Sequence, residues 1–251
     1  MSHCGNPSVH IGDKGLRMGR QLTRRLAAEY LGSLALAAVV IGSGIAAQRL
    51  SPGDVGLQLL ENAAATAAGL FAIILVFAPV SGAHINPIVS LVDALFGGLA
   101  WRDLPAYVVA QLAGCASGAA VANIMFTTDV VSISTTHRAT IAHGVSEVVA
   151  TIGLLLVIFS LSRTGRAERV PAAVAAYIGA AYFFTSSTSF ANPAITIGRM
   201  FSDTFAGIDP SSAPEFIAAQ LIGGFLAVIL IRALYPNIAP AHAATRSSGR
   251  G

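Results

Sequence analysis

Six long apolar segments, separated by shorter polar stretches, follow one another along the 251-residue chain. A helix needs about 20 mainly apolar residues to cross a membrane, and each segment comes close to that length. The segments cover residues 22–46, 56–80, 104–127, 141–162, 170–187 and 214–235. The fifth is the shortest and runs into a Ser/Thr-rich stretch. The pattern predicts an all-α membrane protein with six transmembrane helices.

Two further apolar stretches are too short to span, and each begins with Asn-Pro directly after a long segment. They are found in Ser81-Gly82-Ala83-His84-Ile85-Asn86-Pro87-Ile88-Val89-Ser90 and in Ser189-Phe190-Ala191-Asn192-Pro193-Ala194-Ile195-Thr196. Asn is among the best N-caps and Pro suits the first helical position, so each copy predicts a helix start. At membrane depth such a break is tolerated only where protein buries it or a watery cavity hydrates it. One copy alone fits a surface helix equally well, but two copies predict re-entrant half-helices beside a pathway across the bilayer.

Three landmarks recur in the same order in both halves of the chain. An acidic residue within a span, Glu29 or Glu147, comes first, one Asn-Pro follows, and an Ala-Gln-x-x-Gly element ends the series at Gln111 or Gln220. Each half holds an odd number of spans, so the second copy is inverted in the membrane. The chain therefore predicts one channel domain over residues 22–235, built from inverted repeats over about 22–127 and 141–235.

The charged residues orient this domain. Only 11% of the residues are charged, against about 25% in a soluble domain, and 54% are hydrophobic. If both termini lie in the cytoplasm, only Arg49, Arg138 and Arg199 of the 15 Lys and Arg residues fall on the other side. This bias predicts cytoplasmic termini, with a basic tail over residues 1–21 and a disordered tail over 236–251. The net charge of +3 is thus explained by orientation, and no nucleic acid partner is expected.

Several polar side chains inside the spans need partners. Glu29 and Glu147 are costly in a membrane, and we expect them to accept N–H groups of the two interrupted loops rather than to relay protons. We expect Gln111 and Gln220 to form buried hydrogen bonds between helices. For His84 a ligand or pH-sensing role competes with that of a satisfied buried group, which we favour. The two cysteines show no disulfide or zinc spacing, and no cofactor or metal is expected.

With its two Asn-Pro boxes, paired glutamates and Ala-Gln-x-x-Gly elements, the sequence resembles the major intrinsic protein family, that is, the aquaporins and aquaglyceroporins. The resemblance implies a right-handed bundle of six tilted helices, half-helices that meet at the midplane, and a homotetramer with one pore per subunit. It implies that the pore motifs are Asn86, Pro87, Ile88, Asn192, Pro193 and Ala194. Two helix N-termini and two Asn amides at the midplane favour a neutral hydrogen-bonding solute over a cation.

The narrowest ring of the pore departs from the family pattern. Counted from the Asn-Pro boxes, the filter residues are Thr66, Ala180, Ser189 and Ile195, where water-selective members usually carry an aromatic, a His and an Arg. These substitutions predict a wider, less polar ring that passes glycerol, urea or neutral metalloid hydroxides. With such a second box, the sequence resembles the bacterial members associated with arsenic resistance. This resemblance implies arsenite or methylated arsenicals as solutes. It also implies a bacterial inner membrane as the location.

A charged residue follows each Asn-Pro box at the same distance. Helical spacing places Arg199 on the Asn192 face, one turn outward of Ile195, and predicts that it enters the outer vestibule with Asp203 as its partner. A solvated salt bridge without a role in transport is the alternative. Asp93 is the counterpart of Arg199 in the first half, where a plain surface charge is expected.

Together these features predict a passive channel for small uncharged solutes and water. A water-selective aquaporin is the alternative within the family. An ion channel is a second alternative, because loss of the filter arginine weakens cation exclusion, and a coupled transporter with broken helices is a third. The chain has no His cluster, Cys-His pairing, phosphate-binding loop or flanking carboxylate pair, so no enzyme is expected.

Overall fold

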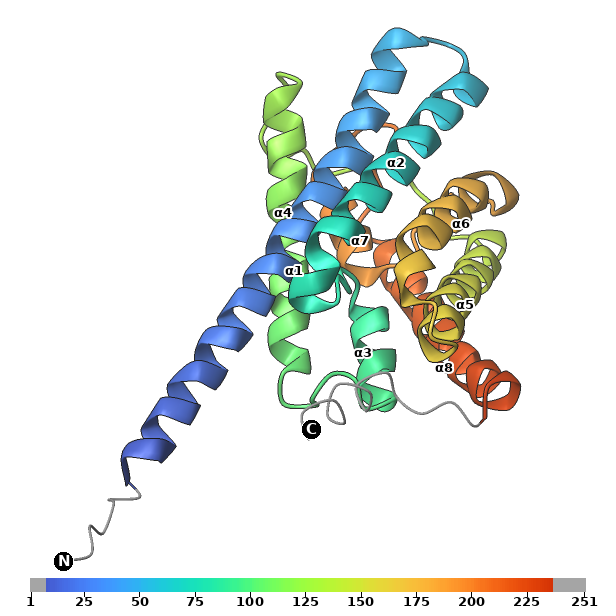
Figure 1. Cartoon of the computed structure of the whole chain (residues 1–251). Coiled ribbons are helices and arrows are strands. Elements are labelled where there is room, and N and C mark those ends of the chain that lie inside the picture. Colours follow the sequence, from blue (N-terminus) through green and yellow to red (C-terminus); the bar gives the residue numbers. More distant parts are fainter. Residues whose placement is uncertain (1–7, 237–251) are drawn as a thin grey trace, which may run out of the picture.

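The computed structural model describes residues 8–236, and over this range the chain forms helices and loops without a strand (Figure 1). The long helices are α1 (Ser8–Leu50), α2 (Val55–Ser81), α4 (Leu104–Met125), α5 (Ile141–Arg163), α6 (Val170–Phe184) and α8 (Ala213–Leu234). All but α6 are long and apolar enough to cross a membrane. Helix α6 has 15 residues, because the chain leaves the helix at Thr185 on its way to the second Asn-Pro box.

The two Asn-Pro boxes begin the short helices α3 (Pro87–Leu95) and α7 (Pro193–Gly198). The Asn86 side chain accepts a hydrogen bond from the backbone N–H of Ile88 at 2.9 Å, and Asn192 accepts one from Ala194 at the same distance. Both are therefore N-caps, with Pro at the first helical position. One 3₁₀ turn, η2 (Arg199–Phe201), continues α7, and another, η1 (Ala167–Arg169), precedes α6.

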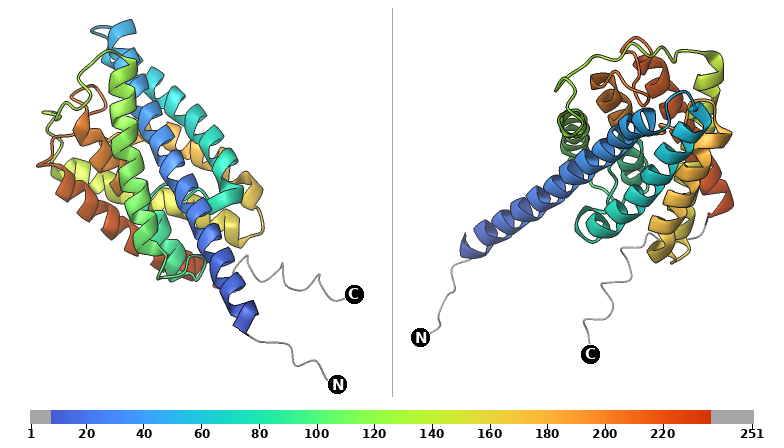
Figure 2. Two further views of the ribbon diagram at one scale, coloured as in Figure 1. Left: turned by 90° about the vertical axis from the view of Figure 1, so that its left-hand side faces the viewer. Right: turned by 90° about the horizontal axis from the view of Figure 1, so that it is seen from above.

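The two halves of the chain repeat the same packing. Helix α1 lies along α4 as α5 lies along α8, and α2 packs against α6 across the junction. Helices α3 and α7 lie between these groups and contact each other (Figure 1). Helix α1 begins and α8 ends at one end of the bundle, here called the terminal end (Figure 2). The opposite end, here called the loop end, is closed by residues 126–140 and 202–212, which hydrogen-bond to each other.

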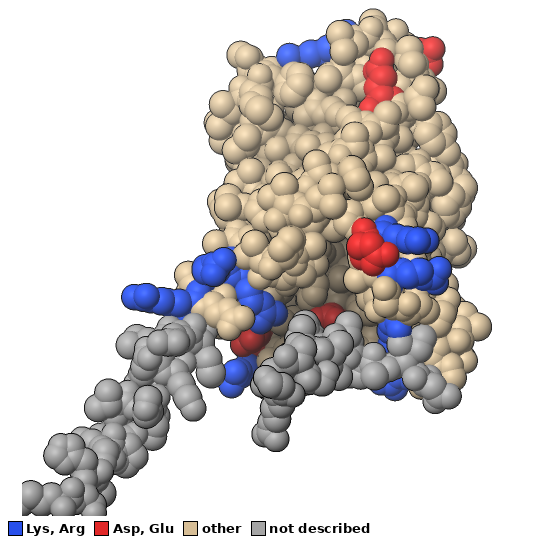
Figure 3. Space-filling model, viewed as in Figure 1, with Lys and Arg blue, Asp and Glu red and all other residues tan. Residues whose placement is uncertain are grey.

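Close helix contacts depend on small residues. A Cβ at Gly114 or Gly118 of α4 would collide with the backbone carbonyl of Tyr30 or Leu34 in α1. Glycine therefore lets the two backbones approach, as small residues do at helix interfaces in membranes. On the face shown in Figure 3, a broad band without charged side chains separates the charged residues of the two ends. This band matches the apolar interior of a bilayer.

Helix α1 differs from the prediction at its start. The sequence placed residues 1–21 in a tail, whereas the helix begins at Ser8 and projects beyond the bundle (Figures 1 and 2). No proline interrupts residues 8–50, and single glycines cost a helix only about 1 kcal/mol each. The predicted disordered tail covers residues 236–251, and all of it after Pro236 lies outside the described range.

Candidate transmembrane pore

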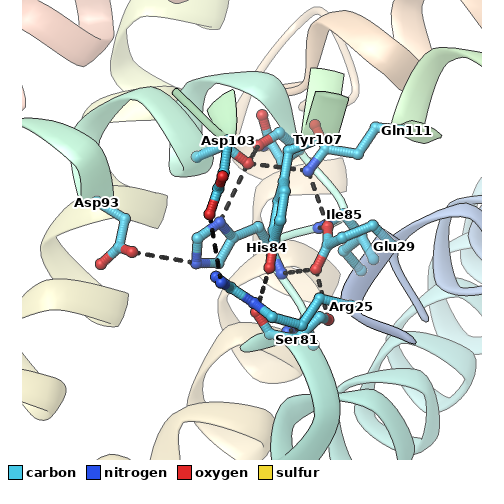
Figure 4. A network of polar contacts seen from close by, with 12 residues as sticks. Arg25, Glu29, Ser81, His84, Ile85, Asp93, Asp103, Tyr107 and Gln111 are labelled. Atoms are coloured by element: carbon cyan, nitrogen blue, oxygen red, sulfur yellow. Dashed lines mark hydrogen bonds and ion pairs between the residues drawn. The ribbon is translucent and has the colours of Figure 1, made fainter. Parts of the chain in front are cut away.

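A buried carboxylate from α1 holds the loop before α3. Glu29 Oε1 accepts hydrogen bonds from Ser81 Oγ at 2.6 Å and from the backbone N–H of His84 at 3.0 Å. Its Oε2 accepts from the N–H of Ile85 at 2.6 Å and from Gln111 Nε2 at 2.8 Å (Figure 4). Four donors thus surround a carboxylate that is fully buried. We call these residues the first frame.

The second half repeats this arrangement with Glu147 from α5. Its Oε1 accepts from Ser187 Oγ at 2.6 Å and from the N–H of Phe190 at 2.9 Å. Its Oε2 accepts from the N–H of Ala191 at 2.8 Å and from Gln220 Nε2 at 2.7 Å. A buried charge is tolerated only when hydrogen bonds satisfy it, and this second frame supplies four.

The glutamines join each frame to the first turn of a half-helix. Besides its glutamate, Gln111 donates to Ser90 Oγ at 2.9 Å, and Gln220 donates to Thr196 Oγ1 at 3.0 Å. Each hydroxyl in turn donates to the carbonyl of the capping asparagine. Each glutamine therefore links its own long helix both to another long helix and to a half-helix.

The frames hold the loops in a conformation that non-glycine residues rarely adopt. Positive φ angles between 43° and 52° occur at Ala83, Ile85, Ser189 and Ala191. Such left-handed positions cost about 1–3 kcal/mol and persist where surrounding contacts impose them. Within residues 8–236, no protein group donates a hydrogen bond to the carbonyls of Ala83, His84, Ser189 or Phe190. These residues line a cavity, so acceptors remain for a molecule inside it.

The two capping asparagines also tie the loops together at the centre of the bundle. Asn86 Nδ2 donates to the carbonyl of Ala191 at 2.8 Å, and Asn192 Nδ2 donates to that of Ile85 at 2.8 Å. An amide has two N–H donors, so each asparagine keeps one for the cavity that both line. Ile88 does not line it and packs instead in an apolar cluster between α3, α5 and α8.

The cavity has a volume of about 640 Å³ and runs from the terminal end past the centre of the bundle. It begins near Arg25, Asp93 and Arg163 at the terminal end and reaches Tyr182 and Arg199 toward the loop end. One wall is made by the two loops. The facing wall is apolar and comprises Leu36, Val40, Leu70, Ile74, Leu154, Ile158, Val174 and Ile178. A passing solute would therefore meet polar groups on one side and hydrocarbon on the other.

Three of the predicted filter residues, Thr66, Ser189 and Ile195, line this cavity, but the fourth prediction is wrong. Ala180 is exposed on the outer side of α6. The cavity is lined instead by Tyr182, whose hydroxyl lies 3.1 Å from Thr66 Oγ1. Two residues are slightly more than half a helical turn, so counting back from Asn192 over a loop of unknown path selected the wrong face. The ring of filter residues thus regains an aromatic side chain.

Arg199 lies in the cavity wall and is 2% exposed. Its Nε donates to the carbonyl of Ala206, and its guanidinium lies 3.4 Å from the centre of the Phe190 ring. The predicted pairing with Asp203 is wrong. Asp203 is exposed and accepts hydrogen bonds from the backbone N–H and the hydroxyl of Thr135 at 2.9 and 3.2 Å. Because the helical turns end at Phe201, the spacing of four residues does not continue to Asp203.

The terminal end of the cavity carries a different set of polar groups. His84 Nε2 lies 3.4 Å from Asp93 Oδ2, and Nδ1 lies 3.1 Å from Ser90 Oγ (Figure 4). The centres of the His84 and Tyr107 rings are 5.5 Å apart, and the Arg25 guanidinium lies over the Tyr107 ring, 5.1 Å from its centre. Asp93 therefore lines the cavity and contacts His84, where the sequence predicted only a surface charge. In the described part of the chain, no three His, Cys, Asp or Glu side chains gather as metal ligands would.

Comparison with known proteins gives this arrangement a family. The model of the major intrinsic protein family matches residues 18–190. Aquaglyceroporin AqpS of Rhizobium meliloti (strain 1021) is 47% identical over 219 residues, which cover 87% of this chain and 93% of that protein. Human aquaporin-9 is 43% identical over 100 residues, 39% of this chain and 33% of that protein.

A solved structure agrees with the fold. The aquaglyceroporin from Plasmodium falciparum superimposes with a TM-score of 0.68 at 20% identity, covering 86% of this chain and 98% of that one. The predicted all-helical membrane fold and the predicted family are thereby confirmed. The chain belongs to the major intrinsic protein family, and it is a multi-pass membrane channel rather than an enzyme.

Proposed function

We propose that the chain conducts small uncharged hydroxylated solutes, glycerol among them, together with water. This proposal rests on the difference between the two walls of the cavity, of which one is polar and the other apolar. Hydroxyl groups can donate to the loop carbonyls of Ala83 and His84 and accept from the amides of Asn86 and Asn192, while a carbon skeleton faces the apolar wall. The similarity to an aquaglyceroporin supports glycerol as a solute.

The same groups disfavour cations. At the centre, the N-termini of α3 and α7 and the free asparagine N–H groups present partial positive charge. Arg199 adds a full positive charge toward the loop end. A cation would lose its hydration shell and meet this positive potential at the centre, so we expect neutral transport without steady ionic conductance. This expectation separates the proposal from an ion channel.

We assign pore roles to two groups of residues. The pore motifs at the centre are Asn86, Pro87, Asn192, Pro193 and Ala194. The filter toward the loop end comprises Thr66, Tyr182, Ser189, Ile195 and Arg199. Ser189 supports this assignment, because its buried hydroxyl has no partner in the described part of the protein and its residue lines the cavity.

A water-selective pore is the second candidate, and one observation favours it. The contact of Tyr182 with Thr66 and the position of Arg199 restore an aromatic and a cation near the filter. The ring is then narrower than the sequence predicted. Neutral metalloid hydroxides such as arsenite share the hydroxyl chemistry of glycerol, and they are included among the solutes to be tested.

We place the channel in the inner membrane of a bacterium, as a homotetramer with both termini in the cytoplasm. The bacterial relative supports the membrane, and the basic residues at the terminal end support the orientation. Large apolar side chains exposed on α2 and α8, such as Leu75 and Phe225, leave surfaces for lipid and for neighbouring subunits.

Stopped-flow light scattering on proteoliposomes tests the proposal with water, glycerol and arsenite as permeants. Ile195→Arg adds bulk and a second cation within the filter, and we expect it to reduce glycerol and arsenite flux more than water flux. Ala180→Leu is the matched control, because this side chain faces outward. Passage of water alone through the wild type would favour the water-selective candidate. Steady current across a planar bilayer would contradict the exclusion of cations.

A further inference from the structure

A second arginine lies beside Arg199 at the loop end. Arg138, from the loop between α4 and α5, donates from Nε to the carbonyl of Gly207 at 2.8 Å and from Nη2 to that of Phe205 at 3.1 Å. The carbonyl between them, that of Ala206, accepts from Arg199 Nε. Three successive carbonyls of one loop are therefore held alternately by two arginines.

The two arginines also share an aromatic ring. The Phe190 ring centre lies 3.4 Å from the guanidinium carbon of Arg199 and 5.6 Å from that of Arg138. Phe190 itself cannot move freely, because its backbone N–H donates to Glu147 and its ring packs against Phe216 at 4.9 Å. The ring and the carbonyl loop together form the surface on which Arg199 rests.

In the described part of the chain, the Arg138 side chain makes two hydrogen bonds to protein, whereas that of Arg199 makes one. The backbone N–H of Arg138 donates to Ser212 Oγ at 2.9 Å, and its carbonyl lies 2.6 Å from His143 Nδ1. Within the described residues, Arg199 makes one side-chain hydrogen bond, through Nε, and its two terminal nitrogens have no protein partner. The Arg199 guanidinium is therefore held by the Phe190 ring and the Ala206 carbonyl, and Arg138 binds the carbonyls of the two residues that flank Ala206.

The positive charge of Arg138 also helps to keep Arg199 at the lumen. Burial lowers the pKa of its guanidinium, with Tyr182 and Glu147 opposing that effect, but an arginine stays protonated at physiological pH. Repulsion between the two cations opposes any movement of Arg199 away from the lumen toward Arg138.

We infer that Arg138 is a positioning residue that determines where Arg199 stands in the pore, and thereby how the channel discriminates between glycerol and water. The inference rests on the proposed role of Arg199 in the filter. Arg138 does not line the cavity, so its effect on solutes passes through Arg199.

A double-mutant cycle tests this inference on the full-length protein in proteoliposomes. The ratio of glycerol to water permeability is measured for wild type, Arg138→Met, Arg199→Met and the double variant. We expect Arg138→Met to raise the ratio roughly three- to tenfold in the wild-type background, the range typical of coupled neighbours, and to leave it unchanged when Arg199 is already Met. Equal effects of Arg138→Met in both backgrounds would overturn the inference.

Arg138→Lys separates position from charge. Lysine keeps the positive charge but lacks the planar fork that bridges two carbonyls. We expect it to shift the ratio as Met does, and wild-type behaviour of this variant would assign the effect to charge and overturn the positioning role. It also provides the same readout if Arg138→Met fails to fold, which size-exclusion chromatography reports.

Arg49→Met is the matched control. Arg49 also lies at the loop end, donates to the carbonyl of Phe126 at 2.6 Å and lies over the Phe126 ring at 5.4 Å, but it does not line the cavity. Its loss should leave the ratio unchanged. If Arg199→Met has no effect while Arg138→Met does, the filter role of Arg199 fails and discrimination belongs to Arg138 directly. If Arg199→Met raises the ratio and both Arg138 variants match the wild type, only the positioning role fails.

Discussion

The residue seven positions after the capping asparagine is Asp93 in the first half and Arg199 in the second. Both line the cavity, at opposite ends. The residue two positions before the asparagine differs as well, since His84 contacts Asp93 whereas Phe190 lies against Arg199. Equivalent positions of the inverted repeat thus carry an anion beside an imidazole at one end and a cation beside a phenyl ring at the other.

The frames behind these residues hardly differ. The four hydrogen bonds to Glu29 measure 2.6–3.0 Å and the four to Glu147 measure 2.6–2.9 Å, from equivalent donors in the same order. The glutamates, serines and glutamines of the frames are buried, where an unpaired donor or acceptor has no water to replace its partner. Side chains at the cavity ends can exchange a protein partner for a solute. The repeat therefore retains the frame and varies the ends.

The largest effect is expected from breaking a frame. Glu147→Gln replaces an acceptor oxygen by an NH₂ group that faces donors, and we expect a loss of about 3 kcal/mol in the free energy of unfolding. Glu29→Gln should cost about the same, since the frames match. Thermal unfolding in detergent measures both against Glu168→Gln, whose side chain is 68% exposed. If only one of the two variants is destabilised, the frames are not equivalent.

The second largest effect is expected on cation exclusion, when the charge at either end of the cavity is removed. A unit charge about 4 Å away costs a permeating cation about 4 kcal/mol at an effective dielectric constant of 20. Arg199→Met should therefore raise cation leak by at least about tenfold, whereas Asp93→Asn should lower or preserve it. Dye-loaded proteoliposomes report the leak. Equal increases in the two variants would show that the ends do not differ in their effect on cations.

A smaller effect tests the corrected filter residue. Tyr182→Ala removes a ring that lines the cavity and contacts Thr66, and we expect severalfold faster glycerol flux with little change in water flux. The same stopped-flow assay should find Ala180→Tyr unchanged, because that position faces outward. A strong block by Ala180→Tyr would restore Ala180 to the filter.

The smallest effect concerns stability at the terminal end. His84 Nε2 lies 3.4 Å from Asp93 Oδ2, and the Asp93 side chain is 25% exposed. Partly hydrated pairs of this kind contribute up to about 1 kcal/mol. Asp93→Asn should therefore shift the thermal midpoint far less than either frame variant. A loss as large as that of Glu29→Gln would mean that the charged ends belong to the structural frame.

Features with a local cause were predictable. The spans follow from runs of apolar residues, and the half-helices follow from Asn86-Pro87 and Asn192-Pro193, whose capping chemistry needs no distant contact. That the acids at positions 29 and 147 would meet loop N–H groups followed from the cost of a charge in a membrane. The missed filter residue is Tyr182. The available signal was its spacing of four residues from Ile178, which places both side chains on the same face of α6.

What the sequence by itself determined was the all-helical fold, the inverted repeat and the two interrupted helices. The spans and the half-helices depend on neighbouring residues, and the repeat is visible because the same landmarks occur in the same order in both halves. Only the tertiary structure decided which face of α6 lines the cavity, since the path of residues 185–191 sets the register between Tyr182 and Asn192. It also decided the partners of Arg199. Ala206 lies in a loop that folds back after α7 ends and Phe190 lies in the loop before α7, and no local spacing specifies the paths of these loops.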